Sequence, residues 1–443
     1  MPSLPFSGEV RSIVTPLSAA SARPLLLHLV NTPQLKIAIL GLHYAPEPSG
    51  NAPYTTSLAE GLAARGHKVR VITGYPHYPE WKVSEEFKGW SRKEDIEGVS
   101  ITRLRHHVPR RPTAVGRLHM ELSFGLRLLF ANWGRPDVVL LVSPALFSSG
   151  VALLRAKCGR KRPGVSIWVQ DLYSRGIVET GGQPGLAARC MARLEGMILG
   201  SAHGVVAIHE RFARYISREL NVSPDAVRIV RNWTHLPPAV PTSRTEIRQR
   251  LGWQENEIIA LHCGNMGKKQ GLENVVAAAR IAEETGSRVK FVLMGDGNQK
   301  EALVAAGRGL THLTFVDSLP QRDFQAALQS ADALLVNELP GVRDMSVPSK
   351  LTSYFTSGVP VVAATDEGSV TAEEIALSGA GVRVDAGNPA ALVLAIDALS
   401  RDSDRSKQLA ANGKRFQQDT LSEATAIAHY DDFITSLALS RGR

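Results

Sequence analysis

The pattern that most constrains this chain is a repeated alternation of short apolar runs with longer amphipathic segments. The first runs are KIAILGL (36–42), VRVIT (69–73), DVVLLVS (137–143) and VSIWVQD (165–171), and segments with helical periodicity separate them. Strands that are apolar on both faces belong to parallel sheets covered by helices on both sides. The sequence therefore predicts an α/β fold built from doubly wound, Rossmann-like sheets.

The alternation breaks once, at RNWTHLPPAVPT (231–242), where three prolines within five residues predict a stiff linker. A second series follows, with strands expected at IIALHCG (258–264), RVKFVLMG (288–295), LTFVD (313–317) and ADALLVN (331–337). We therefore predict an N-terminal extension at 1–34, a first Rossmann-like domain at 35–232, a linker at 233–243, a second Rossmann-like domain at 244–416 and a C-terminal helix at 417–443. Ligands of such sheets bind beyond the carboxyl ends of the strands, so two sheets that face each other predict a site in the cleft between them.

Composition limits the class of protein. The chain has 443 residues, of which 44% are apolar and 21% charged, and this excludes a wholly disordered chain. No run approaches the roughly 18 apolar residues that span a bilayer, so we expect no integral membrane protein. Cys158, Cys190 and Cys263 are far apart, which argues against a disulfide framework and a cysteine-based zinc site and favours the cytoplasm.

The net charge of +9 is distributed unevenly along the chain. Residues 1–240 carry 30 Lys+Arg and 17 Asp+Glu, a net of +13, whereas the remainder has a net of −4. The densest basic stretch runs from Arg103 to Arg127 and also contains Leu122 and Leu126, a pattern typical of a helix on an anionic membrane surface. A solvated charged face is the alternative. The stretch contains no recognisable DNA- or RNA-binding module, so nucleic acid is not expected as a partner.

The most informative loop is GNMGKKQG (264–271), between an expected buried strand and a helix. Gly264 and Gly267 let backbone N–H groups approach an anion, the helix start adds partial positive charge, and Lys268 and Lys269 add full charges. This is chemistry for a diphosphate, although an ordinary turn with two solvated lysines is the alternative. The motif GxxxxGK[ST] is absent, so hydrolysis of ATP or GTP is unsupported.

Three other loops lie between a strand and a helix, where sugar and phosphate contacts occur in such sheets. Gly50 and Asn51 end the long first loop, Gly295 follows RVKFVLM, and Ser349 and Lys350 stand at an expected helix start. A glycine turn or a helix cap is the alternative for each. The first loop lacks GxGxxG, which counts against nicotinamide dinucleotides.

The motifs of common hydrolases and metalloenzymes are missing. HExxH, GxSxG and histidines at metal-ligating spacing do not occur. We interpret Asp402-Ser403-Asp404 as a helix cap rather than a metal-binding DxD. The sequence thus contains no recognised metal-binding motif. Asp171, at the end of VSIWVQD, is the best candidate for a catalytic group because strand ends open into the cleft, and capping of a turn is the alternative.

Several of these segments occur together and in the order of a known family. HYAPEPSGNAPYTTSLAEGLAARGHKVRVIT (43–73), VQDLYSRGIVETG (169–181), RNW (231–233), GNMGKKQGLE (264–273) and MSVPSKLTSYFTSGVPVVA (345–363) resemble family 4 glycosyltransferases of the two-domain GT-B fold. The resemblance covers residues 35–435 and is greatest to the subgroup of colanic-acid fucosyltransferases and related exopolysaccharide enzymes.

The resemblance implies a retaining transfer of sugar from a nucleotide-diphosphate donor on the second domain to an acceptor on the first. Neither a metal nor another cofactor is expected. Gly50 and Asn51 would face the donor across the cleft, and Gly295 and Leu319 would lie near its nucleoside. The other donor-binding residues that it implies are Gly264, Asn265, Gly267, Lys268, Asp344, Ser346, Ser349 and Lys350. We predict that Lys269, with Lys268, neutralises the departing diphosphate and that Asp171 orients the acceptor.

The chain also departs from the family pattern at positions that normally carry charge or a histidine. Asn265 and Gln270 replace an Arg and a Lys of the phosphate loop, Gln170 replaces a histidine before the strand-end Asp, and Met345 and Ser353 replace a pair of glutamates. Glu338 is the residue that we consider as a substitute for the absent ribose-binding glutamate.

The sequence therefore predicts a retaining glycosyltransferase that uses a nucleotide-diphosphate sugar and a glycan or lipid-diphosphate-linked acceptor in cell-surface polysaccharide synthesis. We expect it in the cytoplasm, in contact with the inner membrane face. Two alternatives stay open. A nucleotide-sugar epimerase would bind the same donor and need no acceptor, and a non-catalytic nucleotide-sugar-binding protein would account for the missing glutamates.

Overall fold

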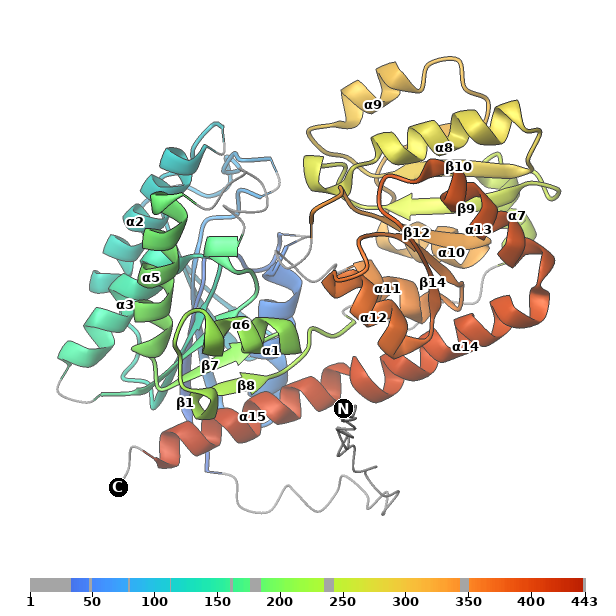
Figure 1. Cartoon of the computed structure of the whole chain (residues 1–443). Coiled ribbons are helices and arrows are strands. Elements are labelled where there is room, and N and C mark those ends of the chain that lie inside the picture. Colours follow the sequence, from blue (N-terminus) through green and yellow to red (C-terminus); the bar gives the residue numbers. More distant parts are fainter. Residues whose placement is uncertain are drawn as a thin grey trace, which may run out of the picture. The chain divides into compact units, whose positions relative to one another are not determined.

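Figure 1 shows two α/β domains, each with a central sheet covered by helices. This computed structural model describes residues 33–47, 50–78, 80–111, 113–159, 162–175, 185–234, 243–342 and 350–440, and the structural statements below refer to these residues. Residues 34–443 belong to one unit. The predicted extension at 1–34 lies almost entirely outside the described residues, as does most of the predicted linker.

The first domain contains an eight-stranded sheet that is parallel except at one edge. The strands are β1 (Lys36–Leu40), β2 (Lys68–Gly74), β3 (Ser91–Ile96), β4 (Val99–Leu104), β5 (Val138–Val142), β6 (Gly164–Val169), β7 (Gly204–Ala207) and β8 (Val227–Ile229), in the order β3-β4-β2-β1-β5-β6-β7-β8. Edge strand β3 pairs antiparallel with β4 and has the sequence SRKEDI. Its charged, exposed side chains protect the open edge, and they gave no apolar run by which sequence analysis could recognise the strand.

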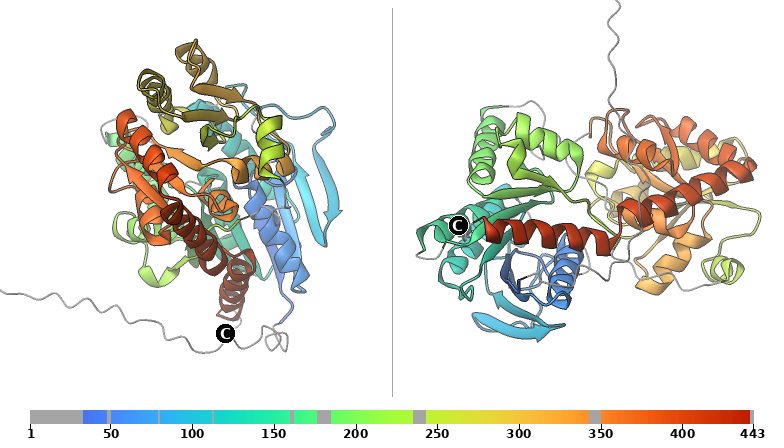
Figure 2. Two further views of the ribbon diagram at one scale, coloured as in Figure 1. Left: turned by 90° about the vertical axis from the view of Figure 1, so that its right-hand side faces the viewer. Right: turned by 90° about the horizontal axis from the view of Figure 1, so that it is seen from below.

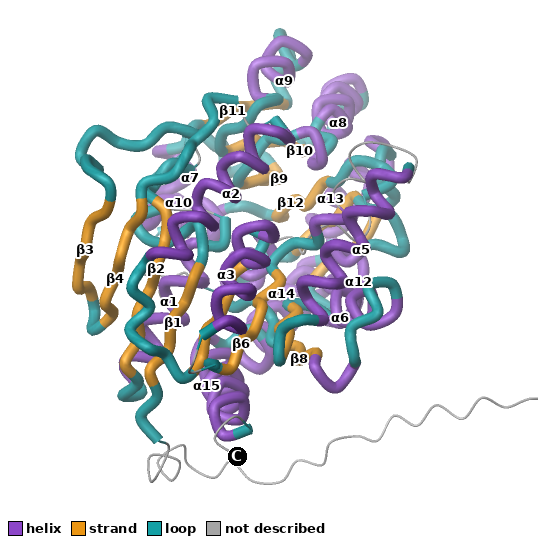
Figure 3. Tube along the Cα trace, turned by 90° about the vertical axis from the view of Figure 1, so that its left-hand side faces the viewer, coloured by secondary structure: helices purple, strands orange, loops and turns teal. Residues whose placement is uncertain are grey.

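Helices cover both faces of this sheet. In Figure 3, α2 (Ala114–Phe130), α3 (Leu146–Cys158) and α5 (Leu186–Gly200) lie side by side on the face turned to the viewer. On the opposite face, α1 (Ala52–Ala64) packs against α15 (Glu423–Leu439). The short helix α6 (Glu210–Arg218) precedes the last strand.

The second domain contains a six-stranded, fully parallel sheet between two apolar cores. Its strands are β9 (Ile258–Cys263), β10 (Val289–Met294), β11 (Leu313–Val316), β12 (Ala333–Asn337), β13 (Val361–Ala364) and β14 (Gly381–Val384), in the order β11-β10-β9-β12-β13-β14. Its helices are α7 (Arg244–Arg250), α8 (Glu273–Glu284), α9 (Lys300–Ala306), α10 (Gln321–Ser330), α11 (Lys350–Ser357), α12 (Val370–Ser378), α13 (Pro389–Arg401) and α14 (Ser403–Thr420). Asp402 accepts the backbone N–H of Arg405 at 2.9 Å, which confirms that the DxD-like triplet caps a helix.

The last helix, α15, returns to the first domain, as the two views of Figure 2 show. Tyr430 and Ile434 are fully buried in the same core cluster as β1 and β6. The Tyr430 ring lies 5.1 Å from that of Trp168 and 6.2 Å from that of Trp233. The predicted limit between residues 416 and 417 falls inside α14, and the chain crosses between domains after Thr420.

A polar contact fixes α15 beside β2. His67 lies 2.8 Å from Asp431, and Arg65 donates to the same carboxylate at 3.1 Å. Burial works against ionisation, but the hydrogen bonds from His67 and Arg65 hold the pKa of Asp431 below its usual value. The ionised carboxylate of Asp431 thus binds two side chains of the first domain, Arg65 and His67.

A second polar contact joins α12 of the second domain to the first domain. Oxygen Oε1 of Glu374 lies 3.0 Å from His209 Nε2 and also accepts a hydrogen bond from Arg231. Although burial opposes it, the hydrogen bond from His209 and the charge of Arg231 keep the pKa of Glu374 below its usual value.

Among the described helices, none combines the length and the apolar character needed to cross a bilayer.

We predict that Ile434→Ala lowers the free energy of unfolding by about 2–5 kcal/mol, because it leaves a cavity in a fully packed core. Leu439→Ala, on the same helix but 60% exposed, is the control and should change it by less than about 0.5 kcal/mol. Urea denaturation followed by tryptophan fluorescence measures both. Equal effects of the two substitutions would show that α15 does not contribute its buried face to the first core.

Candidate functional site

Two glycine loops of the second domain contact each other backbone to backbone at the carboxyl end of its sheet. Gly264 N donates to Met294 O at 2.9 Å, and Met266 N donates to Asp296 O at 2.8 Å. A Cβ atom on Gly295 would lie 2.1 Å from Gly264 O, and the φ of Gly295 is +133°. Glycine is therefore required at Gly295, which gives a structural meaning to a motif that is weak in the sequence alone.

The loop that contains the two lysines ends in one 3-10 turn, η3 (Lys268–Gln270), ahead of α8. The side chain of Gln270 closes this loop, because its Oε1 accepts the backbone N–H of Gly267 at 3.1 Å. The carbonyl of Lys269 accepts the N–H of Leu339 at 2.8 Å, which ties the loop to the segment after β12. Lys268 is exposed and Lys269 is half-buried. Gln270, where the family pattern has a lysine, thus holds the shape of the loop.

The strand-end residue Asp171 and Lys269 interact electrostatically. Burial raises the pKa of Asp171, and the positive charge of Lys269 opposes that rise. Asp171 is also linked to the first loop, because Ser143 Oγ donates to Asp171 O at 3.4 Å and Asn51 Nδ2 donates to Ser143 O at 3.1 Å. The structure thus brings together predicted residues from both domains. Gly50, next to Asn51, is exposed and has a φ of +71°.

Lys350 begins α11 and lies close to the same group of charges. Its Nζ is 3.3 Å from His262 Nε2, and burial lowers the pKa of Lys350 to about 8, with Lys269 adding to the decrease and Cys263 and Glu338 opposing it. Glu338 accepts hydrogen bonds from Thr365 and, at 2.6 Å, from Thr371. Burial raises the pKa of Glu338, while these hydrogen bonds and the two lysines oppose the rise. Both of its carboxylate oxygens therefore already have donors within the domain.

Comparison with known proteins identifies the family. Residues 49–233 match the family described as glycosyl transferase 4-like domain, and residues 243–416 match glycosyl transferases group 1. The chain is 31% identical over 339 residues to glycosyl transferase WcaI of Escherichia coli (strain K12), which is named for colanic acid biosynthesis. The alignment covers 73% of this chain and 82% of that protein.

The chain belongs to the family 4 glycosyltransferases. Their GT-B fold, predicted from the sequence, is confirmed by solved structures. Sucrose-phosphate synthase from Thermosynechococcus elongatus superposes with a TM-score of 0.71 at 17% identity, covering 91% of this chain and 99% of that one. Anabaena Alr3699/HepE in complex with UDP-glucose superposes with a TM-score of 0.66 at 14% identity, covering 90% and 99%.

Some predicted site residues of this glycosyltransferase have no described contact with the glycine loops, Asp171 or the lysines. Leu319 is half-buried against one core of the second domain, and none of its described contacts links it to the glycine loops. Asp344, Ser346 and Ser349 lie outside the described residues, as does Met345. Ser353 is buried in α11, where its carbonyl accepts a hydrogen bond from Thr356. Gln170, which replaces the family's histidine, accepts a hydrogen bond from Asn232 at 2.8 Å.

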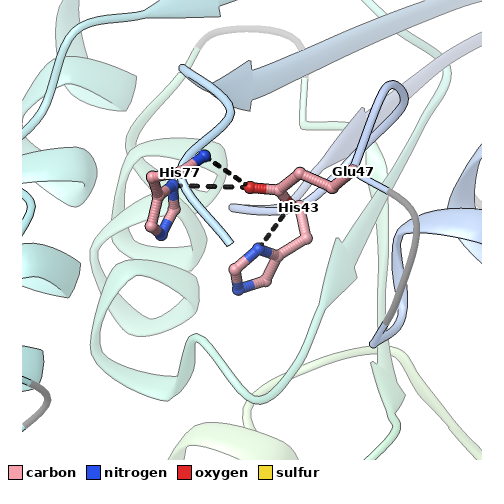
Figure 4. Close-up of side chains that lie close together, drawn as sticks. All are labelled: His43, Glu47 and His77. Atoms are coloured by element: carbon pink, nitrogen blue, oxygen red, sulfur yellow. Dashed lines mark hydrogen bonds and ion pairs between the residues drawn. The ribbon is translucent and has the colours of Figure 1, made fainter. Parts of the chain in front are cut away.

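Sequence analysis missed a cluster of imidazoles at the carboxyl end of the first sheet. His43 and Glu47 follow β1, His77 follows β2, and His106 follows β4. Figure 4 shows that His43, Glu47 and His77 converge, and one ligand atom from each lies within 4.8 Å of the others. Within the described residues this is the single group with a spacing open to a metal ion. The segments HYAPEP and YPHYP hold three of these residues, but residues some 30 positions apart offer no spacing signal.

Burial sets the protonation of this cluster. It lowers the pKa of His77, with the charge of His43 adding to the decrease, and it lowers the pKa of His106 to about 3. Burial alone would raise the pKa of Glu47, but hydrogen bonds and charges from His43 and His77 bring it below the usual value. At neutral pH the cluster thus combines a carboxylate with two neutral imidazoles.

We predict that Gly295→Ala strongly destabilises the second domain, because the new methyl group would meet the carbonyl of Gly264 at 2.1 Å. Gly286→Ala is the matched control, since Gly286 also has a positive φ, +64°, but open space around its Cβ position. The control should cost about 1–2 kcal/mol of backbone strain, and Gly295→Ala at least twice as much. Denaturation midpoints of the two variants measure the difference, and equal midpoints would contradict the required backbone contact.

Proposed function

We propose that this glycosyltransferase is a retaining enzyme that moves a sugar from a nucleotide-diphosphate donor to a glycan or lipid-diphosphate-linked acceptor in cell-surface polysaccharide synthesis. The observation that carries the proposal is the place of Asp171 at a strand end of the first domain, where it is linked through Ser143 to the first loop and interacts electrostatically with Lys269 of the second domain. A carboxyl group on the acceptor side thus lies within electrostatic range of the loop that suits a diphosphate. The similarity to a protein named for colanic acid biosynthesis supports the class of product.

Charge on the second domain supports a diphosphate donor. Lys268, Lys269 and Lys350 lie at or next to the carboxyl end of its sheet, and the start of α8 adds backbone N–H groups. The HepE structure in complex with UDP-glucose shows that a protein of this fold binds such a donor. Three cations and a helix start supply the neutralisation for which other enzymes use a metal, so we expect no metal requirement in the donor site.

In the proposed reaction the bond between the anomeric carbon and the diphosphate oxygen breaks, and the diphosphate leaves with the electron pair. The acceptor hydroxyl gives its proton to a basic group and forms the new bond from the same face of the sugar, so the anomeric configuration is retained. The lysines stabilise the negative charge that develops on the leaving group, and Asp171 orients the acceptor.

A thermal-shift screen with UDP-, GDP- and dTDP-sugars, followed by transfer assays on the stabilising donor, tests the function. A ligand that binds the folded state alone raises the melting temperature by mass action. We expect one nucleotide class to stabilise the protein and the product to keep the configuration of the donor, as read by NMR. Conversion of the donor sugar without an acceptor would instead identify an epimerase, and binding with neither reaction would identify a non-catalytic protein.

We predict that replacing both Lys268 and Lys269 by Ala lowers turnover at saturating donor by about 100-fold or more, because charge stabilisation of the leaving group is lost. Lys407→Ala, an exposed lysine on α14, is the control and should leave turnover unchanged. Initial rates at saturating donor compare the variants. Wild-type turnover in the double variant would remove the two lysines from the mechanism.

We further propose that the enzyme works in the cytoplasm, with its first domain on the anionic inner membrane face. The exposed sides of α2, α3 and α5 form one surface, which we term the α2–α5 face. Its exposed apolar residues are Val115, Leu122, Leu126 and Phe130 on α2, Leu154 on α3, and Leu186 and Met197 on α5. Its exposed basic residues are Arg117, Lys157, Arg189 and Arg193. Basic and apolar side chains on one helical surface are typical of an interfacial contact.

The α2–α5 face differs in detail from the basic stretch predicted from the sequence. Arg103, where that stretch began, is buried and donates to Glu94 at 2.8 Å, so it is part of the fold. Arg127 donates to the carbonyl of Trp90 at 2.9 Å. Arginines of α5, which the sequence analysis did not include, take their place on the surface.

We predict that the double variant Leu126→Glu/Phe130→Glu binds vesicles containing phosphatidylglycerol at least tenfold more weakly than the wild type, because two side chains lose apolar contact and gain repulsion. Leu394→Glu is the control, because Leu394 lies on α13 of the second domain and its exposure is between those of Leu126 and Phe130. This variant should bind the vesicles like the wild type. Co-sedimentation with anionic and with neutral vesicles measures binding. Equal binding of the wild type to anionic and to neutral vesicles would contradict the membrane contact.

A further inference from the structure

The first loop contains a hydrogen-bonded histidine and glutamate whose geometry suits proton transfer. His43 Nδ1 lies 2.7 Å from Glu47 Oε2. The other carboxylate oxygen, Oε1, accepts the backbone N–H groups of His77 at 2.8 Å and Tyr78 at 3.0 Å. The side chain of Glu47 is 2% exposed. Three donors in a buried place hold this carboxylate in one orientation and keep it ionised.

This network decides which nitrogen of His43 carries the proton. An ionised carboxylate can only accept, so Nδ1 of His43 must donate, and in the neutral form of this imidazole Nε2 holds the lone pair. The side chain of His43 is 18% exposed, and within the described residues Nε2 has no hydrogen-bond partner. The His43 ring is thus partly exposed, whereas Nε2 of His77 and Nε2 of His106 are buried.

The pair formed by His43 and Glu47 lies near Asp171, which has a role in the proposed reaction. The His43 ring packs edge-on against Tyr78 at 5.7 Å between centroids. Tyr78 in turn experiences the charges of Arg117, Asp171 and Glu47, and burial together with the two carboxylates raises its pKa. The loop that holds His43 also holds Asn51, which is tied through Ser143 to Asp171. His43 and Asp171 therefore both lie at the carboxyl end of the first sheet, and Asp171 interacts electrostatically with Lys269.

We propose that His43 is a catalytic residue on the acceptor side of this glycosyltransferase and that Glu47 is its positioning residue. This rests on the proposed function. As the acceptor oxygen bonds to the anomeric carbon, its proton passes to Nε2 of His43, while the diphosphate oxygen leaves with the electron pair of the broken bond. The imidazolium that forms is stabilised by the carboxylate of Glu47.

A shared metal ion explains the cluster less well. Nitrogen and oxygen ligands lie about 2.0–2.2 Å from zinc, so two ligands at tetrahedral angles are more than about 3 Å apart. The 2.7 Å between His43 Nδ1 and Glu47 Oε2 is the length of a hydrogen bond. His77 Nδ1 lies 2.9 Å from the carbonyl of Tyr75, so this nitrogen carries a proton and cannot bind a metal at the same time.

The groups that face His43 come from five segments of the first domain. They are Glu47 on its own loop, His77 and Tyr78 after β2, His106 after β4, and, beyond Tyr78, Arg117 on α2 and Asp171 after β6. Burial lowers the pKa of His77 and of His106, whereas the His43 ring is partly exposed, so of the three histidines His43 is the one whose ring a ligand could reach.

The test compares His43→Gln with the wild type in hydrolysis of the stabilising donor, where water replaces the acceptor, and in transfer where an acceptor is found. Gln can still donate to Glu47 but has no basic nitrogen. We expect kcat to fall by about 10²–10⁴-fold, donor KM and the donor-induced thermal shift to stay unchanged, and the acid-side loss of kcat/KM to disappear. Glu47→Gln should lower kcat less and should move that acid-side loss.

His67→Gln is the matched control, because His67 and Asp431 form a histidine–carboxylate pair of similar length, 2.8 Å, away from the cleft. It should lower the melting temperature and leave kcat and the pH profile unchanged. Wild-type kcat in His43→Gln overturns the role of His43. Loss of wild-type activity on chelation, restored by zinc alone, overturns it in favour of a metal centre. A wild type that binds donors but neither hydrolyses nor transfers them refutes the proposed function itself, and this outcome is seen before any variant is measured.

Discussion

One buried carboxylate joins the two sheets. Glu374 of the second domain is shared by His209 and Arg231 of the first, and removing one partner of such a buried group costs about 3–5 kcal/mol. Because parallel strands end at the same edge, this junction brings two rows of carboxyl-terminal loops within reach of each other. Asp171 of one row interacts electrostatically with Lys269 of the other.

The two edges carry different chemistry. The second domain offers cations and backbone N–H groups, with Lys269 and Lys350 held half-buried beside tightly packed glycine loops. The first domain offers carboxylates and imidazoles, including a histidine whose tautomer is set by Glu47. This separation agrees with the proposed reaction, in which the second domain neutralises the leaving group and the first domain orients and deprotonates the acceptor. It also agrees with the basic and acidic halves of the sequence only in part, because Arg103 and several other basic side chains are used within the fold.

Much of the fold was predictable, because buried parallel strands leave continuous apolar runs such as those of β1, β6 and β9. Strand β3 was missed because its charged, exposed side chains resemble a loop. The docking of α15 in the first core was not predicted, because the sequence of an amphipathic helix does not reveal which apolar surface the helix covers. The position of Asp171 and of the lysine loop at the carboxyl ends of their strands was predictable from the sequence. The surroundings of Glu47 were not, since its donors come from residues about 30 positions away.

The sequence by itself determined the family, the α/β class, the succession of the two sheets and the loops at their carboxyl ends, because apolar periodicity and glycine motifs are local properties of the chain. Tertiary structure decided which side chains meet. The φ of Gly295 acquires its meaning from Gly264, the tautomer of His43 from Glu47, and the ionisation of Glu374 from Arg231. Each depends on distance and burial between groups remote in sequence, and these are set only when the sheets and helices have packed.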